Sequence, residues 1–179
     1  MTGVAASVAL ESSAALQGAL ERMRQLGDNP RRIWEALGTY GESSTRRRFK
    51  KSVGPGGARW KPSARALASG GRTLEDKGAY GGLLGSITHR ADANSAEWGT
   101  NKIYAGTHQF GGVIVPKSAR SLRFAVPGGF VSTKRVTMPA RPFLGVDAED
   151  GQALQEVALD VVRLAEAGRG GSPGADRAR

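Results

Sequence analysis

The chain has no cysteine among its 179 residues, which excludes disulfide bonds and thiolate metal sites and is typical of a protein made in a reducing cytosol. It has only two histidines, His89 and His108, so a zinc site would need carboxylates for its remaining ligands. No run approaches the roughly 18 apolar residues that span a bilayer, and residues 1–10 lack the basic and apolar regions of a secretion signal. We therefore expect no cofactor, no metal and no membrane contact.

Acidic residues are absent from two long stretches, 43–74 and 98–146. These two stretches contain 16 lysines and arginines, so their positive charge exceeds the formal net charge of +10 of the whole chain. The acids gather instead near the C-terminus, at Asp147, Glu149, Asp150, Glu156, Asp160 and Glu166. Complementary potentials align interfaces, so the basic body of one subunit could meet the acidic helix of another. A solvated basic surface beside an acidic helix is the alternative, and the sequence leaves both open.

Apolar residues at helical spacing predict two N-terminal helices, over 11–26 and 30–49. Between them, Gly27 suits the left-handed end of a helix, Asn29 can cap the next one and Pro30 suits its first turn. So short a turn predicts an antiparallel helical hairpin. The side chains expected to face the core are Leu16, Leu20, Met23, Ile33, Trp34, Leu37 and Tyr40.

Glycine and proline mark a loop at residues 54–57, and Trp60 follows in a polar stretch. A lone tryptophan in such a loop is expected to anchor it to the core, with a ligand contact as the less favoured reading. Ser63 is expected to cap a short helix reaching Leu67. A further short helix is predicted over 79–87, although its glycines weaken it.

From residue 87 the apolar period changes to two, as in half-buried strands. The pattern predicts an antiparallel sheet of four to five strands, with a long hairpin over about 113–137. The segment 104–112 (YAGTHQFGG) is also predicted to be a β-strand. The last helix should bury Leu154, Val157, Ala158, Val161, Leu164 and Ala165 and end at Gly168. The expected fold class is α+β, with the sheet packed by the helical hairpin and the C-terminal helix, in one domain over 1–168 followed by a disordered tail over 169–179.

No motif organises catalysis. His108 lacks a nearby acid in sequence to orient it, so a structural hydrogen-bonding role is favoured. No serine lies in a nucleophile elbow, and no glycine pair leads into a phosphate-binding loop. We expect neither an enzyme nor a small-molecule substrate.

The densest cluster of charge is a set of five cations around Phe49, itself expected in the core: Arg46, Arg47, Arg48, Lys50 and Lys51. Some of them complement the negative end of the helix dipole, but five exceed what capping requires. We predict salt-sensitive contact with DNA or with an acidic partner, and any DNA binding should be independent of sequence because no recognition motif accompanies the cluster.

Two motifs carry a family resemblance: 104–112 (YAGTHQFGG) and 138–144 (MPARPFL). Together with the loop motif PGGARW at 55–60, they resemble the phage virion morphogenesis (tail completion) family of Mu-like bacteriophages. The loop lacks the leucine common three residues after the tryptophan. The motif residues singled out as structural or interface positions are Trp60, Tyr104, His108, Gln109, Phe110, Arg141, Pro142 and Phe143. In the second motif, the prolines at 139 and 142 should hold Arg141 extended and present Phe143 to the core.

The resemblance implies a structural virion protein of the phage head–tail junction. Such a protein, made in the host cytoplasm, would form a homo-oligomeric ring, with a hexamer favoured although the sequence leaves the ring order open. It would terminate or complete the tail, join it to the capsid, and contact other neck and tail proteins and transiently the DNA in the channel. The alternative is a stand-alone, basic, sequence-independent nucleic-acid-binding protein.

Overall fold

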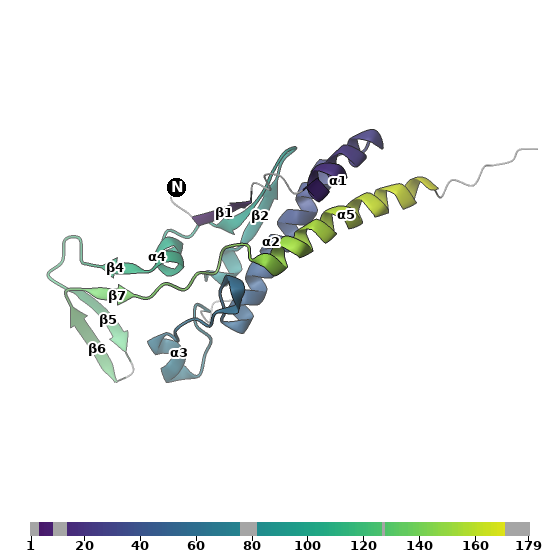
Figure 1. Cartoon of the computed structure of the whole chain (residues 1–179). Coiled ribbons are helices and arrows are strands. Elements are labelled where there is room, and N and C mark those ends of the chain that lie inside the picture. Colours follow the sequence, from purple (N-terminus) through teal and green to yellow (C-terminus); the bar gives the residue numbers. More distant parts are fainter. Residues whose placement is uncertain (1–3, 9–13, 76–81, 127, 171–179) are drawn as a thin grey trace, which may run out of the picture.

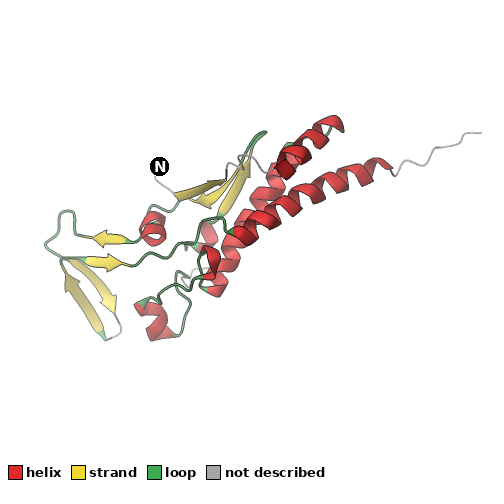
Figure 2. Ribbon diagram, in the orientation of Figure 1, coloured by secondary structure: helices red, strands yellow, loops and turns green. Residues whose placement is uncertain are grey.

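The computed structural model of the protein describes residues 4–8, 14–75, 82–126 and 128–170, and it confirms the α+β class (Figure 1, Figure 2). The helices are α1 (Ala14–Gln25), α2 (Arg31–Lys51), α3 (Ala64–Ser69), α4 (Ala105–Phe110) and α5 (Ala148–Gly170), with 3-10 turns η1 (Pro55–Gly57) and η2 (Leu84–Ser86). The strands are β1 (Val4–Val8), β2 (Thr88–Ala91), β3 (Ala96–Thr100), β4 (Gly112–Ile114), β5 (Leu122–Val126), β6 (Gly129–Thr133) and β7 (Val136–Met138).

The turn between α1 and α2 forms as the sequence predicts. Gly27 adopts a left-handed conformation (φ 63°), and the N–H of Asp28 donates to Met23 O at 3.0 Å, which closes the end of α1. The side-chain oxygen of Asn29 accepts from the N–H of Arg31 at 3.0 Å and so caps the start of α2. The helical hairpin is therefore built by local hydrogen bonds.

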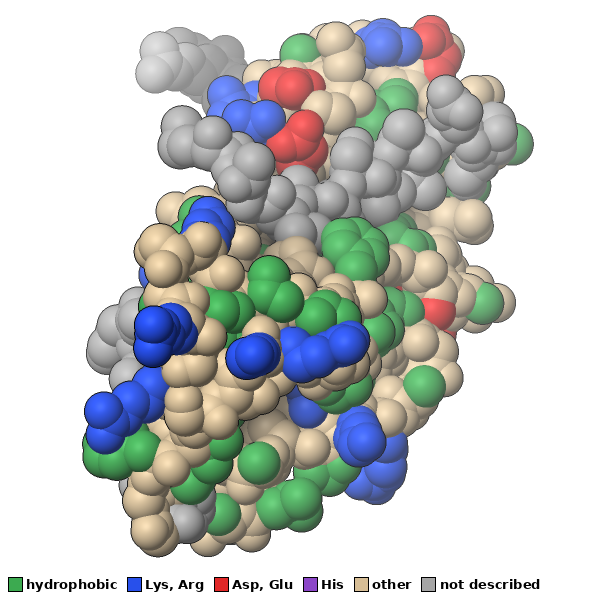
Figure 3. Space-filling view, turned by 90° about the vertical axis from the view of Figure 1, so that its left-hand side faces the viewer, with side chains coloured by type: hydrophobic (Ala, Val, Ile, Leu, Met, Phe, Trp, Pro, Cys, Tyr) green, Lys and Arg blue, Asp and Glu red, His purple; other side chains and the backbone are tan. Residues whose placement is uncertain are grey.

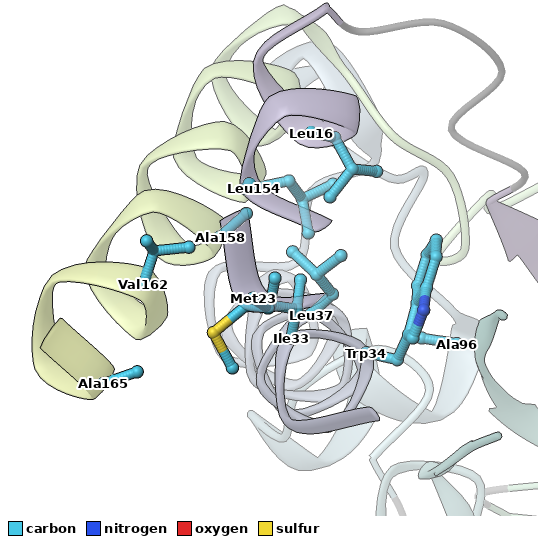
Figure 4. Close-up of a cluster of buried hydrophobic side chains, with 11 residues drawn as sticks. Leu16, Met23, Ile33, Trp34, Leu37, Ala96, Leu154, Ala158, Val162 and Ala165 are labelled. Atoms are coloured by element: carbon cyan, nitrogen blue, oxygen red, sulfur yellow. The ribbon is translucent and has the colours of Figure 1, made fainter. Parts of the chain in front are cut away.

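The main core lies between α1, α2 and α5 (Figure 4). Leu16, Met23, Ile33, Trp34 and Leu37 are buried as expected. On α5, Leu164 is 68% exposed, contrary to expectation, and Val162 is buried in its place. The buried face of α5 runs through 154, 158, 162 and 165, a slightly different stripe of the same helix. The helix also continues two residues past Gly168, and residues 171–179 of the predicted tail lie outside the described residues.

A three-stranded antiparallel sheet of order β1-β3-β2 packs on α2. β2 and β3 match the predicted strands, whereas β1 has no counterpart in the sequence prediction. Trp98 on β3 pairs with His89 on β2. A Cβ on Gly38 of α2 would lie 2.7 Å from His89 Cδ2, and one on Gly41 would overlap the Trp98 indole. These two glycines allow the sheet to lie directly on the helix.

The predicted long hairpin exists, but it consists of two successive two-stranded ladders, β4–β7 and β5–β6. We call residues 112–138 the arm, and it extends away from α1, α2 and α5 (Figure 1). The described strands thus form three small sheets and not one sheet of four to five strands. Most arm residues are exposed, so no shared buried face holds these strands against the sheet on α2.

The segment expected as β around residue 105 is instead the helix α4. Ala105 is fully buried, and His108 and Gln109 follow it at the i+3 and i+4 spacing of one helical face. Gly111 (φ 73°) ends the helix where a Cβ would lie 2.8 Å from Ala140 N, so the close approach requires glycine. Of the helix predicted over 79–87, residues 82–87 form a turn around η2, and the rest lies outside the described residues.

Candidate interaction surfaces

The side chain of Gln109 joins α4 to the segment 141–144 that leads into α5. Its Oε1 accepts from the N–H groups of Phe143 at 2.9 Å and Leu144 at 3.1 Å, and its Nε2 donates to Leu144 O at 2.8 Å. Beside it, the N–H of Arg141 donates to His108 O at 2.7 Å. The two motifs singled out in the sequence are therefore hydrogen-bonded to each other at the base of the arm.

Phe143 and Trp60 belong to a second core cluster with Phe49 of α2. The Phe49 ring centroid lies 5.3 Å from that of Phe143 and 5.4 Å from that of Trp60, the latter edge to face. Trp60 Nε1 donates to Pro142 O at 2.8 Å. As expected, Trp60 anchors its loop to the core and Phe143 is buried.

Arg141 is also buried, with 3% of its surface exposed. Its Nε donates to Lys61 O at 2.7 Å and its Nη2 lies 3.5 Å from Pro62 O, which holds the loop after Trp60 against the motif. Its Nη1 has no hydrogen-bond partner among the described residues. Burial lowers the pKa of the Arg141 guanidinium from its usual value, although arginine stays protonated in proteins.

His108 lies partly buried with its ring edge against Tyr104, at a centroid distance of 6.0 Å. Burial and then the charge of Arg141 lower the pKa of His108 below 6.5, so the ring is neutral at pH 7. Its Nδ1 has no hydrogen-bond partner among the described residues, and no acid contacts it there to form a catalytic pair. Tyr104 and Phe110 are exposed, at 42% and 73%.

The five predicted cations do not share one face. Arg48 points inward, where it pairs with Asp150 and with Asp147 and donates to Gly145 O at 2.7 Å. Arg46 pairs with Glu42 at 2.9 Å and donates to Ile87 O at 2.8 Å, while Arg47 lies over the Tyr40 ring at 5.4 Å. Lys50 and Lys51 are exposed. DNA or partner contact by this cluster stays a prediction, now limited mainly to Arg47, Lys50 and Lys51.

The Arg48–Asp150 pair was not predicted from the sequence, although the buried positions of α2 indicate that Arg48 faces inward. Positions 34, 37, 41, 44 and 48 are all buried and lie on one helical face. Asp150 also accepts from Ser44 Oγ at 2.7 Å and Tyr40 Oη at 3.1 Å. Asp147 accepts from the N–H groups of Gly56 at 2.8 Å and Asp150 at 2.9 Å, and these bonds, the Gly56 bond first, lower the pKa of Asp147. Part of the acidic helix is thus neutralised within its own chain.

The arm presents hydrophobic side chains to solvent. Its exposed large hydrophobic side chains are Val113 at 52%, Ile114 at 40%, Val115 at 58%, Phe124 at 40%, Phe130 at 68% and Val131 at 39%. Arg123 lies over the Phe130 ring at 4.9 Å. Viewed from the arm side of the molecule, hydrophobic and cationic side chains lie intermixed (Figure 3). Clustered exposed hydrophobic side chains of this kind mark interaction sites.

Comparison with known proteins decides the family. The sequence profile of the phage virion morphogenesis family matches residues 12–163. The chain belongs to this family. It is also similar to a curated protein, "Mu-like prophage FluMu G protein 2" of Haemophilus influenzae, with 29% identity over 157 residues that cover 88% of this chain and 96% of the relative. No solved structure matches the chain significantly.

The matched range of this virion morphogenesis protein includes α4, the arm, both motifs and most of α5. The family has a structural or assembly role in the virion. Within the described residues, no helix is long and apolar enough to cross a membrane, and no cluster of three or more His, Asp or Glu side chains is placed to hold a metal ion.

Proposed function

We propose that this virion morphogenesis protein acts at the phage head–tail junction, where its copies assemble into a ring that completes the tail and joins it to the capsid. Its role is structural and not enzymatic, and its partners are further copies, with a hexamer as the expected ring, and the adjoining neck and tail proteins. The family match and the likeness to a Mu-like prophage protein support a virion role.

The main support for self-assembly is the exposed hydrophobic surface of the arm. A hairpin whose hydrophobic side chains face solvent, extended away from the main core, is suited to packing on a neighbouring copy. Rings close through heterologous surfaces, in which one patch of a subunit meets a different patch of the next. The arm supplies a cationic and apolar patch that could meet such a surface.

The outer face of α5 fits as the receiving patch. It carries Glu149 and Glu156, which take part in none of the ion pairs among the described residues, and the exposed Leu159 and Leu164. Individual surface ion pairs contribute about 0–1 kcal/mol, so apolar contacts of the arm must supply most of the affinity. Raising the salt concentration should then slow assembly more than it dissolves finished rings.

The direct test compares two equally exposed hydrophobic positions. Phe130→Ser changes the arm, and Leu67→Ser changes α3, where the side chain is 74% exposed. Sedimentation velocity and negative-stain imaging should show rings for the wild type and for Leu67→Ser, and loss of rings for Phe130→Ser. Rings that survive Phe130→Ser combined with Val131→Ser would contradict the role of the arm.

Imaging of purified phage particles tests the location. Density for this fold as a ring between capsid and tail is expected, and density elsewhere in the particle would overturn the proposed junction role. The alternative function, sequence-independent DNA binding, is favoured by the exposed Arg47, Lys50 and Lys51 at the end of α2. Its test is the retention of random duplex DNA across a salt series.

A further inference from the structure

A cavity of about 540 Å³ opens beside Arg141, a size typical of ligand pockets. Three segments line it: residues 61–65, which lead into α3, the side chains of Tyr104 just before α4 and of His108 within it, and the stretch from Val136 to Arg141. Leu74 and Leu83 add apolar surface. The cavity therefore lies where the arm, α4 and the loop after Trp60 meet.

The charge of this cavity is one-sided. Lys61 and Arg141 are among its walls, and no described lining residue is acidic. Arg141 is 97% buried, yet none of the ion pairs formed by described residues includes it, and its hydrogen-bond acceptors are the neutral carbonyls of Lys61 and Pro62. A buried cation without a counter-charge is unfavourable, because its lost hydration is not replaced.

Two buried nitrogen atoms in the cavity walls also lack partners. Arg141 Nη1 and His108 Nδ1 are shielded from water and make no hydrogen bond among the described residues. Such groups carry the full cost of desolvation. An anion that enters the cavity would offset the cost at the charged Arg141 by Coulomb attraction, which is stronger beside the protein than in bulk water.

We propose that this cavity is a binding site for a protein carboxylate, carried by an acidic side chain or by a polypeptide C-terminus that is flanked by apolar residues. The positive charge of Arg141 and Lys61 attracts the carboxylate, and the leucines with Val136 and Met138 accept its apolar neighbours. A duplex DNA phosphate fits less well, because its backbone cannot enter a recess with apolar walls. The site is independent of where in the virion the protein acts.

The protein offers a simple spectroscopic test, since it has only two histidines. His108 lines the cavity, whereas His89 is held between α2 and β2 by Glu42 at 2.6 Å and serves as an internal control. The full-length protein, labelled with ¹³C, is titrated with N-acetyl-leucine, with the uncharged N-acetyl-leucinamide and with dimethyl phosphate. The ring signals of His108 should shift and saturate with the carboxylate alone, and those of His89 should stay fixed.

Matched variants locate the site. Lys61→Gln, at an exposed position of the cavity rim, should weaken binding of N-acetyl-leucine up to about fivefold, and Lys50→Gln, equally exposed on α2, should leave it unchanged. Arg141→Gln should weaken the binding of N-acetyl-leucine at least tenfold. If the Arg141→Gln variant does not fold, Lys61→Gln alone tests the proposal. The proposal is overturned if His108 does not shift at tens of millimolar probe, if the amide or the phosphate acts equally well, or if Lys50→Gln weakens binding as much as Lys61→Gln.

A dilution series without probe identifies the source of the carboxylate. If a second copy supplies it, the His108 signals should depend on protein concentration, and N-acetyl-leucine should reverse that dependence. If another virion protein supplies it, the signals should be independent of concentration while the probe still binds.

Discussion

Two arginines of this protein are almost equally buried, Arg48 with 6% and Arg141 with 3% of its surface exposed. They differ in the groups that their guanidinium groups contact. Arg48 meets two carboxylates, Asp147 and Asp150, at the junction of α2 and α5. Among the described residues, the side chain of Arg141 donates only to backbone carbonyls, beside an open cavity. The first charge is neutralised within the protein and holds the fold together. The second is left for a partner, so an equal degree of burial does not imply an equal role.

The largest loss of stability is expected from substitutions that break the ion pair of Arg48. Asp150→Ala should lower the free energy of unfolding by about 3–5 kcal/mol, because it leaves Arg48 buried without its main partner. Urea denaturation measures the change. Asp160→Ala, on an exposed side chain of the same helix, should stay within about 0.5 kcal/mol. Similar losses in both variants would mean that the Arg48 pair adds nothing specific.

Phe143 follows Arg141 by two residues, and its carbonyl oxygen accepts from Arg48 Nη1 at 3.4 Å. Its ring is fully buried against Phe49. Phe143→Ala should cost about 3–5 kcal/mol through the lost apolar contact and the cavity left behind. An unchanged melting temperature would show that the segment 141–144 is not a structural clamp.

A smaller loss is expected at the uncompensated arginine. Arg141→Met removes the hydrogen bond to Lys61 O, which should cost about 1–2 kcal/mol. It strands no carboxylate of the described residues, among which Arg141 has no ionic partner. Arg48→Met strands two carboxylates and should cost about 3–5 kcal/mol. Denaturation of both variants at one pH tests the contrast, which fails if Arg141→Met is the more destabilised.

His108, which lies near Arg141, should make the free energy of unfolding depend on pH, and this effect should be smaller than that of the arginine substitutions. The pKa of His108 is lowered below 6.5 in the folded protein, so the unfolded protein takes up the proton first. Stability should therefore be unaffected above pH 6.5, fall as the pH drops below 6.5, and stop falling through this group once the pH is below its folded pKa. His108→Gln should flatten that part of the curve of unfolding free energy against pH. An unaltered slope in this variant would contradict the assignment.

The smallest effect concerns the cations beside Arg48. Arg47, Lys50 and Lys51 remain on the surface. Three phosphate contacts imply a slope of about −3 in a plot of log DNA affinity against log salt concentration, whereas five contacts would imply roughly −4 to −5. Retention of random duplex DNA should fall when these three become serine. Arg24, Arg31 and Arg32 changed to serine alter the net charge equally and serve as the control. No binding at low salt would leave only a protein contact for this cluster.

Much of the helical structure could be predicted because its signals are local. The Gly27 turn, the Asn29 cap and the Ser63 cap, whose Oγ accepts from Ala66 N at 3.1 Å, depend on neighbours in the sequence. The burial of Trp60 and Phe143 followed from their setting between prolines and glycines. These features need no knowledge of distant partners.

The features that the sequence did not predict depend on contacts between residues far apart in the chain. Whether Arg48 points inward is decided by Asp150, 102 residues away, and the helix α4 is fixed by bonds from Gln109 to residues 143 and 144. The described strands divide into three sheets because no described residue buries the arm against the sheet on α2. The cavity at Arg141 joins three segments that no sequence pattern connects.

The hydrogen bonds of Gln109 also have a mechanical consequence. The strand β4 begins directly after α4, and β7 leads into the segment 141–144, so both legs of the arm leave the body at the bonds formed by His108, Gln109 and Arg141. A pull on the arm is shared by these bonds and by the buried ring of Phe143. Tension applied at the tip is thereby carried into α5 through a braced joint, and the two legs resist separation together.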